Sequence, residues 1–430
     1  MPENNNQCDC MILNLWSCVN YGAALTCYGV QCLAESLGLS SKVIHYVPKI
    51  ALVYKGSFAE KFAKKYLNLT TPVQNYNDFL LLNNNCNIFI TGSDQVWNPG
   101  IMRTHHSNVS ENIYLLDFVK KENKKISYAP SFGVTDFYNN FKLNKEYKEI
   151  FQYYINQFDS ISVREDDGVK ILKDTFNIDS IQLLDGAFHI PKDKLDEMTK
   201  NYTKTEKYIG CFTLPYFQTQ KWYEKILDKI SKKLNVPVKN YNFNSTKSVE
   251  EWLGFIKNAD FIVTDSYHAV VFSIIFNVPF IQIANAKTQS RFMSLFRLLN
   301  IDDNSINEKN APNLDIENII KDYDWDSINQ TVSLEIKKAA DWLKAAINKQ
   351  KEDKVQDMDF LNYFVSKTLF DKENLEKKIK YLYCKDKITR RYYRYKILSK
   401  ITFGKIKKKY KARKNYYHKL VRFIREETKL

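Results

Sequence analysis

Glycine and proline are scarce in this sequence, with 12 and 10 among 430 residues. Such low numbers exclude collagen-like repeats and argue against long disordered stretches. The sequence has no run of 18 or more apolar residues, so no membrane-spanning helix is expected. The N-terminal MPENNNQCDC lacks the basic start and apolar stretch of a secretory signal peptide. We therefore expect a globular protein of the cytoplasm.

The eight cysteines are scattered, and none of their spacings matches a zinc site of the Cys-x-x-Cys or Cys/His type. Without a secretory signal, they are expected to be reduced thiols. The sequence therefore predicts neither a disulfide framework nor a metal site.

The net charge of +15 is concentrated at the C-terminus. Residues 385–430 contain 18 lysines and arginines against three acidic residues, Asp386, Glu426 and Glu427. The remaining 384 residues carry 46 basic and 46 acidic side chains and are neutral overall. The basic character of the protein therefore belongs to this tail.

Short β-rich runs alternate with helical patterns, which predicts parallel α/β architecture. The predicted strands are residues 10–16, 42–47, 87–93, 125–133, 160–165, 181–186, 208–214, 236–241, 261–266 and 279–284. The predicted helices are residues 22–37, 218–234, 249–257, 269–277, 290–299 and 335–349. A charged, polar stretch at 191–207 separates two series of strands. We therefore predict Rossmann-like domains at 1–195 and 205–305, a helical segment packing back at 310–384, and a basic tail at 385–430.

Three polar clusters directly follow predicted strands. They are Asn20-Tyr21-Gly22, the stretch TGSDQVWN at 91–98, and the stretch TDSYH at 264–268. Ligands of doubly wound sheets bind beyond the carboxyl ends of the strands, where a helix N-terminus also suits a phosphate or carboxylate. For Asp265 and Ser266, helix capping is an equally good explanation.

His268 lies at this predicted ligand edge, with a polar loop before it and an apolar helix after it. A histidine in apolar surroundings is most often structural, but this position favours a functional role. We assign no role to His45, His105, His106 or His418, and the role of His189 stays open. Arg164 lies at the end of the predicted strand SISVRE, where it could pair with Glu165, Asp166 and Asp167 or bind an anion.

Several of these stretches resemble the polysaccharide pyruvyl transferase family. The resemblance rests on NYGAALTCYGVQ, GSDQVWN, SVREDDGVKIL, ADFIVTDSYHAVVFSIIFNVPFI and SRFMSLFRLL, in that order, over about residues 8–300. It implies two Rossmann-like domains in a glycosyltransferase-B-like arrangement. It also implies transfer of the enolpyruvyl unit of phosphoenolpyruvate onto two sugar hydroxyls, which forms a pyruvate ketal and releases phosphate.

The resemblance also suggests roles for individual residues. His268 would be the general acid–base residue, because a group with a pKa near 7 suits proton transfer in both directions. Some members carry arginine where this chain has Ser266, and many carry glycine where it has Ala269. Anion binding is therefore expected from Arg164, with Arg291 as second choice and Lys257 as a further candidate. The remaining predicted substrate-binding residues are Ser93, Asp94, Gln95, Asn20, Gly22, Asp265, Ser266 and Tyr267. No cofactor is expected, since phosphoenolpyruvate is a co-substrate.

Two other functions remain open. A nucleotide-sugar-dependent glycosyltransferase would have the same fold and would also place a basic group near a diphosphate. The aromatic and basic tail also fits nucleic-acid binding, but a neutral α/β body is unnecessary for that, so we expect no nucleic-acid partner.

The tail is expected to be helical and to hold the enzyme at an anionic membrane surface, at the inner face of the cytoplasmic membrane. A merely solvated basic helix is the alternative. The acceptor would be a sugar or a lipid-linked glycan of a cell-surface polysaccharide.

Overall fold

The computed structural model of the protein describes residues 6–17, 20–48, 56–104, 109–110, 112–137, 145–214, 222–242, 247–284, 289–302, 305–309, 320 and 323–351. The predicted helical tail at 385–430 lies outside the described residues. His105, His106 and His418 lie outside them as well, as do the first residues of the helix predicted at 218–234.

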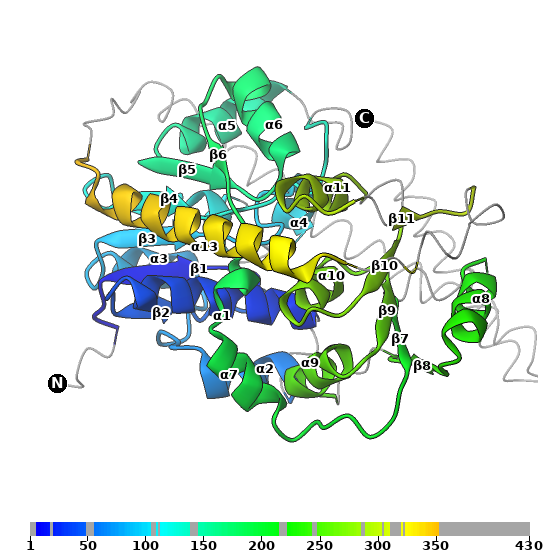
Figure 1. Ribbon diagram of the computed structural model, residues 1–430. Helices are drawn as coiled ribbons and strands as arrows, with labels where there is room; N and C mark the ends of the chain where they lie inside the picture. The colour runs from blue at the N-terminus through cyan, green and yellow to red at the C-terminus, as the bar shows by residue number, and fades with distance from the viewer. Residues whose placement is uncertain are drawn as a thin grey trace, which may run out of the picture. The chain divides into compact units, whose positions relative to one another are not determined.

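The chain folds into two parallel sheets with interleaved helices (Figure 1). The first sheet has the order β2-β1-β3-β4-β5-β6. Its strands are β1 (Cys10–Leu13), β2 (Ser41–Val43), β3 (Ile88–Thr91), β4 (Lys124–Ser127), β5 (Ser160–Val163) and β6 (Ile181–Gln182). The second sheet has the order β11-β10-β9-β7-β8. Its strands are β7 (Ile209–Phe212), β8 (Val238–Asn240), β9 (Phe261–Thr264), β10 (Phe280–Ile283) and β11 (Ser305–Ile306).

Both sheets follow the same winding rule. If β7 is counted as the first strand of its sheet, the two orders coincide as 2-1-3-4-5, with β6 added to the first. All the strand pairs are parallel. In such sheets the strand order reverses between the first and third strands, and ligands bind beyond the carboxyl ends at that point. The predicted α/β class with two parallel, Rossmann-like sheets is confirmed, and the glycosyltransferase-B-like arrangement stays a prediction.

Helices connect and cover the strands. Those of the first sheet are α1 (Tyr21–Ser36), α2 (Phe58–Tyr66), α3 (Tyr76–Leu82), α4 (Pro99–Thr104), α5 (Lys145–Ile155), α6 (Asp166–Phe176) and the short 3₁₀ helices η1 (Ile113–Leu115) and η2 (Gly186–His189). They are followed by α7 (Lys192–Thr199), α8 (Glu224–Leu234), α9 (Val249–Lys257), α10 (Tyr267–Ile275), α11 (Gln289–Leu298) and α13 (Trp325–Asn348).

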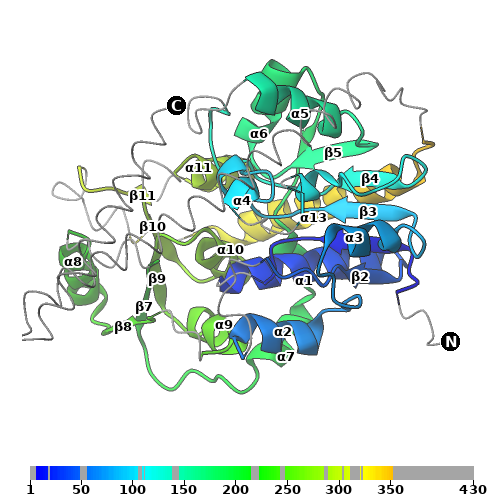
Figure 2. The same cartoon turned by 180° about the vertical axis from the view of Figure 1, so that it is seen from behind.

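Alternating side chains bury both faces of each sheet, as parallel sheets require. In β1, Cys10 and Ile12 join one hydrophobic cluster, while Met11 and Leu13 join another on the opposite face. The cluster containing Cys10 also includes buried residues of α9 and α10, among them Trp252 and Phe272. One continuous apolar core therefore lies between the two sheets, and Figure 2 shows α9 and α10 on the side of the second sheet that faces α1 and α2.

Helix α13 spans both sheets (Figures 1 and 2). Near its start, Tyr323 stacks on Trp325 and donates a hydrogen bond to the carbonyl of Phe280 in β10. Near its end, the Lys124 ammonium at the start of β4 donates to the carbonyls of Ile347 and Lys349. The helix therefore runs from the second sheet to the amino end of the strands of the first.

Two glycines bring α1 into direct contact with η2. A Cβ atom at Gly29 would lie 1.8 Å from the carbonyl oxygen of Gly186, and one at Gly186 would lie 2.5 Å from that of Thr26. Real Cβ atoms essentially never approach so closely, so both positions require glycine. This contact holds the middle of α1 against the loop that follows β6.

We predict that Gly29→Ala destabilises the protein by about 3 kcal/mol, as overpacking of a tight backbone contact does. Helix propensity alone would favour alanine by about 1 kcal/mol, so a loss can only come from the contact. Urea unfolding measures the change. Ser36→Ala, at the end of the same helix, is the control and should change stability by no more than about 0.5 kcal/mol. Equal stability of Gly29→Ala and the parent protein would contradict the packing.

Candidate functional site

Polar side chains gather where the strands of the first sheet end. Ser93 and Asp94 follow β3, Arg164 follows β5, and Asp185 follows β6. Because these strands are parallel, their carboxyl ends meet at one edge of the sheet. The TDSYH stretch follows β9 of the second sheet and contacts the same edge through His268 and Tyr267. The switch points of both sheets therefore contribute to one site.

Asp185 is the centre of this site, and its side chain has no exposed surface. Its Oδ1 atom accepts hydrogen bonds from the Thr26 hydroxyl at 2.7 Å and the Ala187 amide at 2.9 Å. Its Oδ2 atom accepts from Arg164 at 2.8 Å and lies 3.3 Å from the Ser93 hydroxyl, whose hydrogen has a closer acceptor in the Ala129 carbonyl at 2.8 Å. Burial alone would raise the pKa of Asp185, but attraction to His268 and Arg164 outweighs it and holds the pKa well below its ordinary value. Asp185 is therefore a carboxylate at neutral pH.

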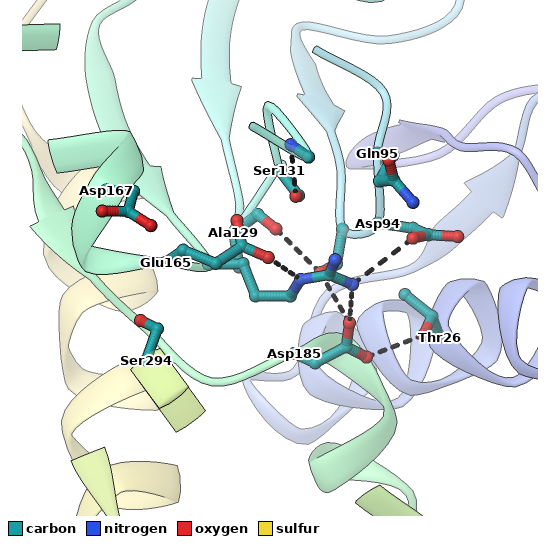
Figure 3. A network of polar contacts seen from close by, with 12 residues as sticks. Thr26, Asp94, Gln95, Ala129, Ser131, Glu165, Asp167, Asp185 and Ser294 are labelled. Atoms are coloured by element: carbon teal, nitrogen blue, oxygen red, sulfur yellow. Dashed lines mark hydrogen bonds and ion pairs between the residues drawn. The ribbon is translucent and has the colours of Figure 1, made fainter. Parts of the chain in front are cut away.

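Arg164 binds three carboxylates from three elements. Its guanidinium lies 2.7 Å from Glu165, 2.8 Å from Asp185 and 3.3 Å from Asp94, and Figure 3 shows these three side chains turned toward one point. The arginine is 2% exposed. Its Nη2 atom is buried without a hydrogen-bond partner among the described residues. One donor of this cation therefore stays available.

The expected pairing of Arg164 with the acids that follow it holds for Glu165 alone. Asp166 instead pairs with Arg297 of α11 at 2.7 Å. Its backbone N–H donates a hydrogen bond to the hydroxyl of Ser294 in the same helix. These contacts join α6 of the first sheet to α11 of the second. Figure 3 shows Ser294 and Asp167 away from the carboxylates around Arg164.

His268 is the second residue of α10 and is 4% exposed. Its Nε2 atom lies 2.9 Å from the Thr26 hydroxyl and 3.7 Å from Oδ2 of Asp185. Its ring packs against Gly22 of α1, where a Cβ atom would lie 2.1 Å from the ring carbon Cγ. Gly22 therefore makes room for the imidazole.

The ring of Tyr267, the residue before His268, makes cation–π contacts with two arginines. The guanidinium carbon of Arg164 lies 4.2 Å from the ring centre, and that of Arg291 in α11 lies 6.0 Å away. Burial and repulsion from Arg164 lower the pKa of Arg291, although a guanidinium stays charged in proteins. Its Nε atom is buried without a partner among the described residues. The TDSYH stretch therefore places a pair of arginines beside the imidazole.

Four of the predicted binding residues make local structural contacts. Asn20 caps α1 by accepting from the Gly22 amide, and Ser266 caps α10 by accepting from the Ala269 amide. Asp265 accepts a hydrogen bond from the Leu214 amide after β7, and Gln95 accepts one from Asn98. Lys257, the further candidate for anion binding, pairs with Asp196 at 2.7 Å.

Two residues of the site, Thr26 and Asp185, were not predicted from the sequence. Asp185 follows a strand and precedes a glycine, so the rule that found the other strand-end residues applies to it as well. Thr26 lies within α1, one turn after Gly22 and one before Gly29, and no neighbouring residue in the sequence indicates that it belongs to a polar site.

His189, whose role was left open, is buried and contacts the Tyr128 hydroxyl. Burial lowers the pKa of His189 to about 4, so this imidazole is neutral at pH 7.

Neither a metal site nor a membrane span is found in the part of the chain that the structure describes. No cluster of three or more His, Cys, Asp or Glu side chains there could hold a metal ion. None of the described helices is both long and apolar enough to cross a membrane.

Burial raises the pKa of Asp265 from its ordinary 3.8 to about 7. The folded protein therefore holds this proton more tightly than the unfolded chain, and its contribution to stability is lost as the pH rises from about 4 to 7. We predict that Asp265→Asn, which keeps an acceptor for the Leu214 amide, removes this loss. The free energy of unfolding of the variant minus that of the parent, measured with urea, should therefore increase as the pH rises from 4 to 8. The exposed Asp193→Asn is the control, and a difference that is constant with pH would refute the assignment.

Comparisons with known proteins give the chain its family. A search of curated proteins finds no match. Among solved structures, the chain is similar to a putative UDP-N-acetylglucosamine 2-epimerase from Listeria monocytogenes, with 8% identity, a TM-score of 0.48, and coverage of 81% of this chain and 99% of the other. It is also similar to UDP-GlcNAc 2-epimerase of Methanocaldococcus jannaschii, with 11% identity, a TM-score of 0.39, and coverage of 80% and 93%. The sequence model of the polysaccharide pyruvyl transferases matches residues 20–287, more than half of the chain. The protein is therefore a member of the polysaccharide pyruvyl transferase family.

Proposed function

We propose that the protein transfers the enolpyruvyl unit of phosphoenolpyruvate to a sugar of a cell-surface polysaccharide or its precursor, forming a pyruvate ketal. Membership of the family supports a transferase that acts on a glycan. The observation that carries the proposal is the TDSYH stretch, which sets His268 beside two arginines that share the Tyr267 ring. A proton-transfer group next to cations is what an anionic enol phosphate requires.

In this proposal His268 protonates the methylene carbon of phosphoenolpyruvate, which becomes a methyl group. A sugar hydroxyl attacks the cationic carbon that results, and its proton returns to His268. The bond to the phosphate oxygen then breaks and a second hydroxyl attacks, so two C–O bonds to the sugar form. The second hydroxyl proton leaves with the phosphate, which keeps the reaction balanced.

The geometry favours Arg291 over Arg164 as the main anion-binding residue. Arg164 is already compensated by the three carboxylates of Asp94, Glu165 and Asp185. Arg291 forms no ion pair with any described residue and has a buried Nε–H without a partner. Arg291 therefore supplies the less compensated charge for the carboxylate or phosphate, while Nη2 of Arg164 adds one donor. Ser93 and Asp94 lie next to them and would contact the sugar.

We predict that the purified protein releases phosphate from phosphoenolpyruvate in the presence of a suitable sugar, tested over a panel of acceptors. His268→Gln should lower kcat by about 10²–10⁴-fold, the usual contribution of a positioned general acid–base group. His45→Gln is the matched control, because the His45 ring packs on Trp16, outside the group of side chains around Asp185 and Arg164. A His268→Gln variant that folds normally and keeps full activity would contradict the mechanism.

A nucleotide-sugar-dependent glycosyltransferase is the alternative function. Ligand binding to the folded protein raises the melting temperature by mass action. If UDP-sugars raise the melting temperature and phosphoenolpyruvate does not, the alternative replaces the proposal. If phosphoenolpyruvate alone raises it, the alternative fails.

We also propose that the basic tail at 385–430 holds the enzyme to an anionic membrane surface on the cytoplasmic side, where a lipid-linked acceptor would be found. Its 18 basic residues against three acids support this, since each basic residue near such a surface contributes about 1 kcal/mol. Its tyrosines and aliphatic residues would enter the headgroup region.

The tail proposal predicts that the full protein sediments with phosphatidylserine-containing vesicles and not with neutral ones. A chain ending at Cys384 should lose this binding, and salt at about 0.5 M should weaken it because screening shortens the reach of the charges. Equal sedimentation of the two chains, or binding that salt does not change, would show that the tail is no membrane anchor. If the full protein binds nucleic acid through the tail and does not bind the vesicles, nucleic acid would replace the membrane as its partner.

A further inference from the structure

The hydroxyl of Thr26 lies between a carboxylate and the imidazole of the site. It is 2.7 Å from Oδ1 of Asp185 and 2.9 Å from Nε2 of His268. Thr26 is fully buried in the middle of α1, where Figure 3 shows its side chain directed at Asp185. Both contacts have ordinary hydrogen-bond lengths, so the hydroxyl bridges the two groups.

A hydroxyl has one hydrogen, and the charges around Asp185 decide where it goes. Asp185 pairs with Arg164 at 2.8 Å and accepts from the Ala187 amide, so it is ionised and can only accept. The Thr26 hydrogen therefore points to Asp185. The Thr26 oxygen then faces His268 with its lone pairs and can only accept a hydrogen from Nε2. With the hydrogen on Nδ1, two lone pairs would face each other at 2.9 Å.

We infer that Thr26 and Asp185 are positioning residues that keep His268 protonated on Nε2 and leave Nδ1 as the nitrogen that exchanges protons with the substrate. The reaction named here rests on the proposed function, whereas the protonation pattern of the ring does not. In the reaction, Nδ1–H of the imidazolium donates to the methylene carbon, and Nδ1 of the neutral ring later takes the hydroxyl proton. The Nε2–H bond stays intact throughout.

The packing of α1 agrees with this direction of transfer. A Cβ atom at Gly22 would lie 2.3 Å from Nδ1, so any other residue at this position would cover the nitrogen. No hydrogen-bond partner of Nδ1 is found among the residues for which the structure gives side chains. The glycine therefore admits the ring against the first turn of α1 and places no side chain over Nδ1.

The carboxylate of Asp185 is a charged group close to the imidazole. Oδ2 of Asp185 lies 3.7 Å from Nε2, and the Tyr267 ring, 5.5 Å from that of His268, contacts the guanidiniums of Arg164 and Arg291. Thr26 passes the effect of Asp185 to the ring through one hydrogen bond without giving up a proton.

The test uses the full chain labelled with ¹⁵N-histidine, whose ring signals report which nitrogen carries the hydrogen. The His268 signals are assigned by their loss in His268→Gln. In the neutral ring we expect a protonated Nε2 and an unprotonated Nδ1. Thr26→Val, which keeps the shape and removes the hydroxyl, should shift both nitrogens toward values averaged over the two forms. Thr26→Ser should restore the original pattern.

Tyr128→Phe is the matched control for the spectra. It removes the hydroxyl that contacts His189, so it should move the His189 signals and leave those of His268 in place. In kinetics, Thr26→Val should lower kcat by about 10–100-fold with little change in KM, because the imidazole remains and only its fixed tautomer, with the hydrogen on Nε2, is lost. Thr26→Ser should recover kcat to within a few-fold.

Several outcomes would overturn the inference. These are a neutral His268 protonated on Nδ1 in the parent protein, or His268 signals in Thr26→Val that match those of the parent. An unchanged kcat in Thr26→Val, in a protein whose His268→Gln variant is inactive, would also overturn it and leave the proposed function standing. If the spectra are as expected but His268→Gln is active, the catalytic role of His268 would be wrong. The role of Thr26 in fixing the tautomer of the imidazole would still stand.

Discussion

The buried carboxylate of Asp185 is the interaction on which the rest of the site depends. A carboxylate without exposed surface is costly unless it is paired and hydrogen-bonded. Here helix α1, the end of β5 and a backbone amide of η2 supply its donors, namely Thr26, Arg164 and Ala187. Each of these elements must keep its place for the charge to stay compensated. The position of His268, which contacts Thr26, follows from the same requirement.

Glycines make this arrangement sterically possible. Gly29 and Gly186 let the backbones of α1 and η2 touch, which brings Thr26 to Asp185, and Gly22 lets α10 approach with its imidazole. In a chain with only 12 glycines, three of them line this one contact. At each of these three positions a side chain would collide with its neighbours.

Much of the fold could be predicted because it depends on local patterns. The apolar run before TDSYH forms β9, and the run after it forms α10, which begins at Tyr267, two residues before the predicted start. The helix at 249–257 has the predicted bounds, while α2, α3 and α5 were not predicted. In α2, however, Phe58, Phe62 and Tyr66 recur at every fourth residue, which is a helical pattern in the sequence itself that the prediction overlooked.

The site was predictable where its residues follow strands and unpredictable where a long-range contact recruits them. Arg164 and His268 stand next to strand ends, and strand ends of a parallel sheet meet wherever the strands lie in the sequence. Thr26 has no such mark, since a threonine in an apolar helix usually fills core space. Its role arises because η2, about 160 residues later in the chain, presents a carboxylate to it. Such a pairing depends on how the helix and the sheet pack, and no spacing within the helix encodes it.

The network also links the chemistry to the packing of the two sheets. Thr26 and Asp185 belong to the first sheet and its helices, and His268 belongs to the second, so the hydrogen bond between Thr26 and His268 forms only while the two sheets are packed together. Tyr21 of α1 stacks on Trp252 of α9 at 5.5 Å, and Lys65 of α2 pairs with Glu250 of α9 at 3.0 Å. On the other side of the site, Arg297 pairs with Asp166. Contacts on both sides of His268 thus set its distance to Thr26, and the protonation pattern of the imidazole becomes a property of the interface between the sheets.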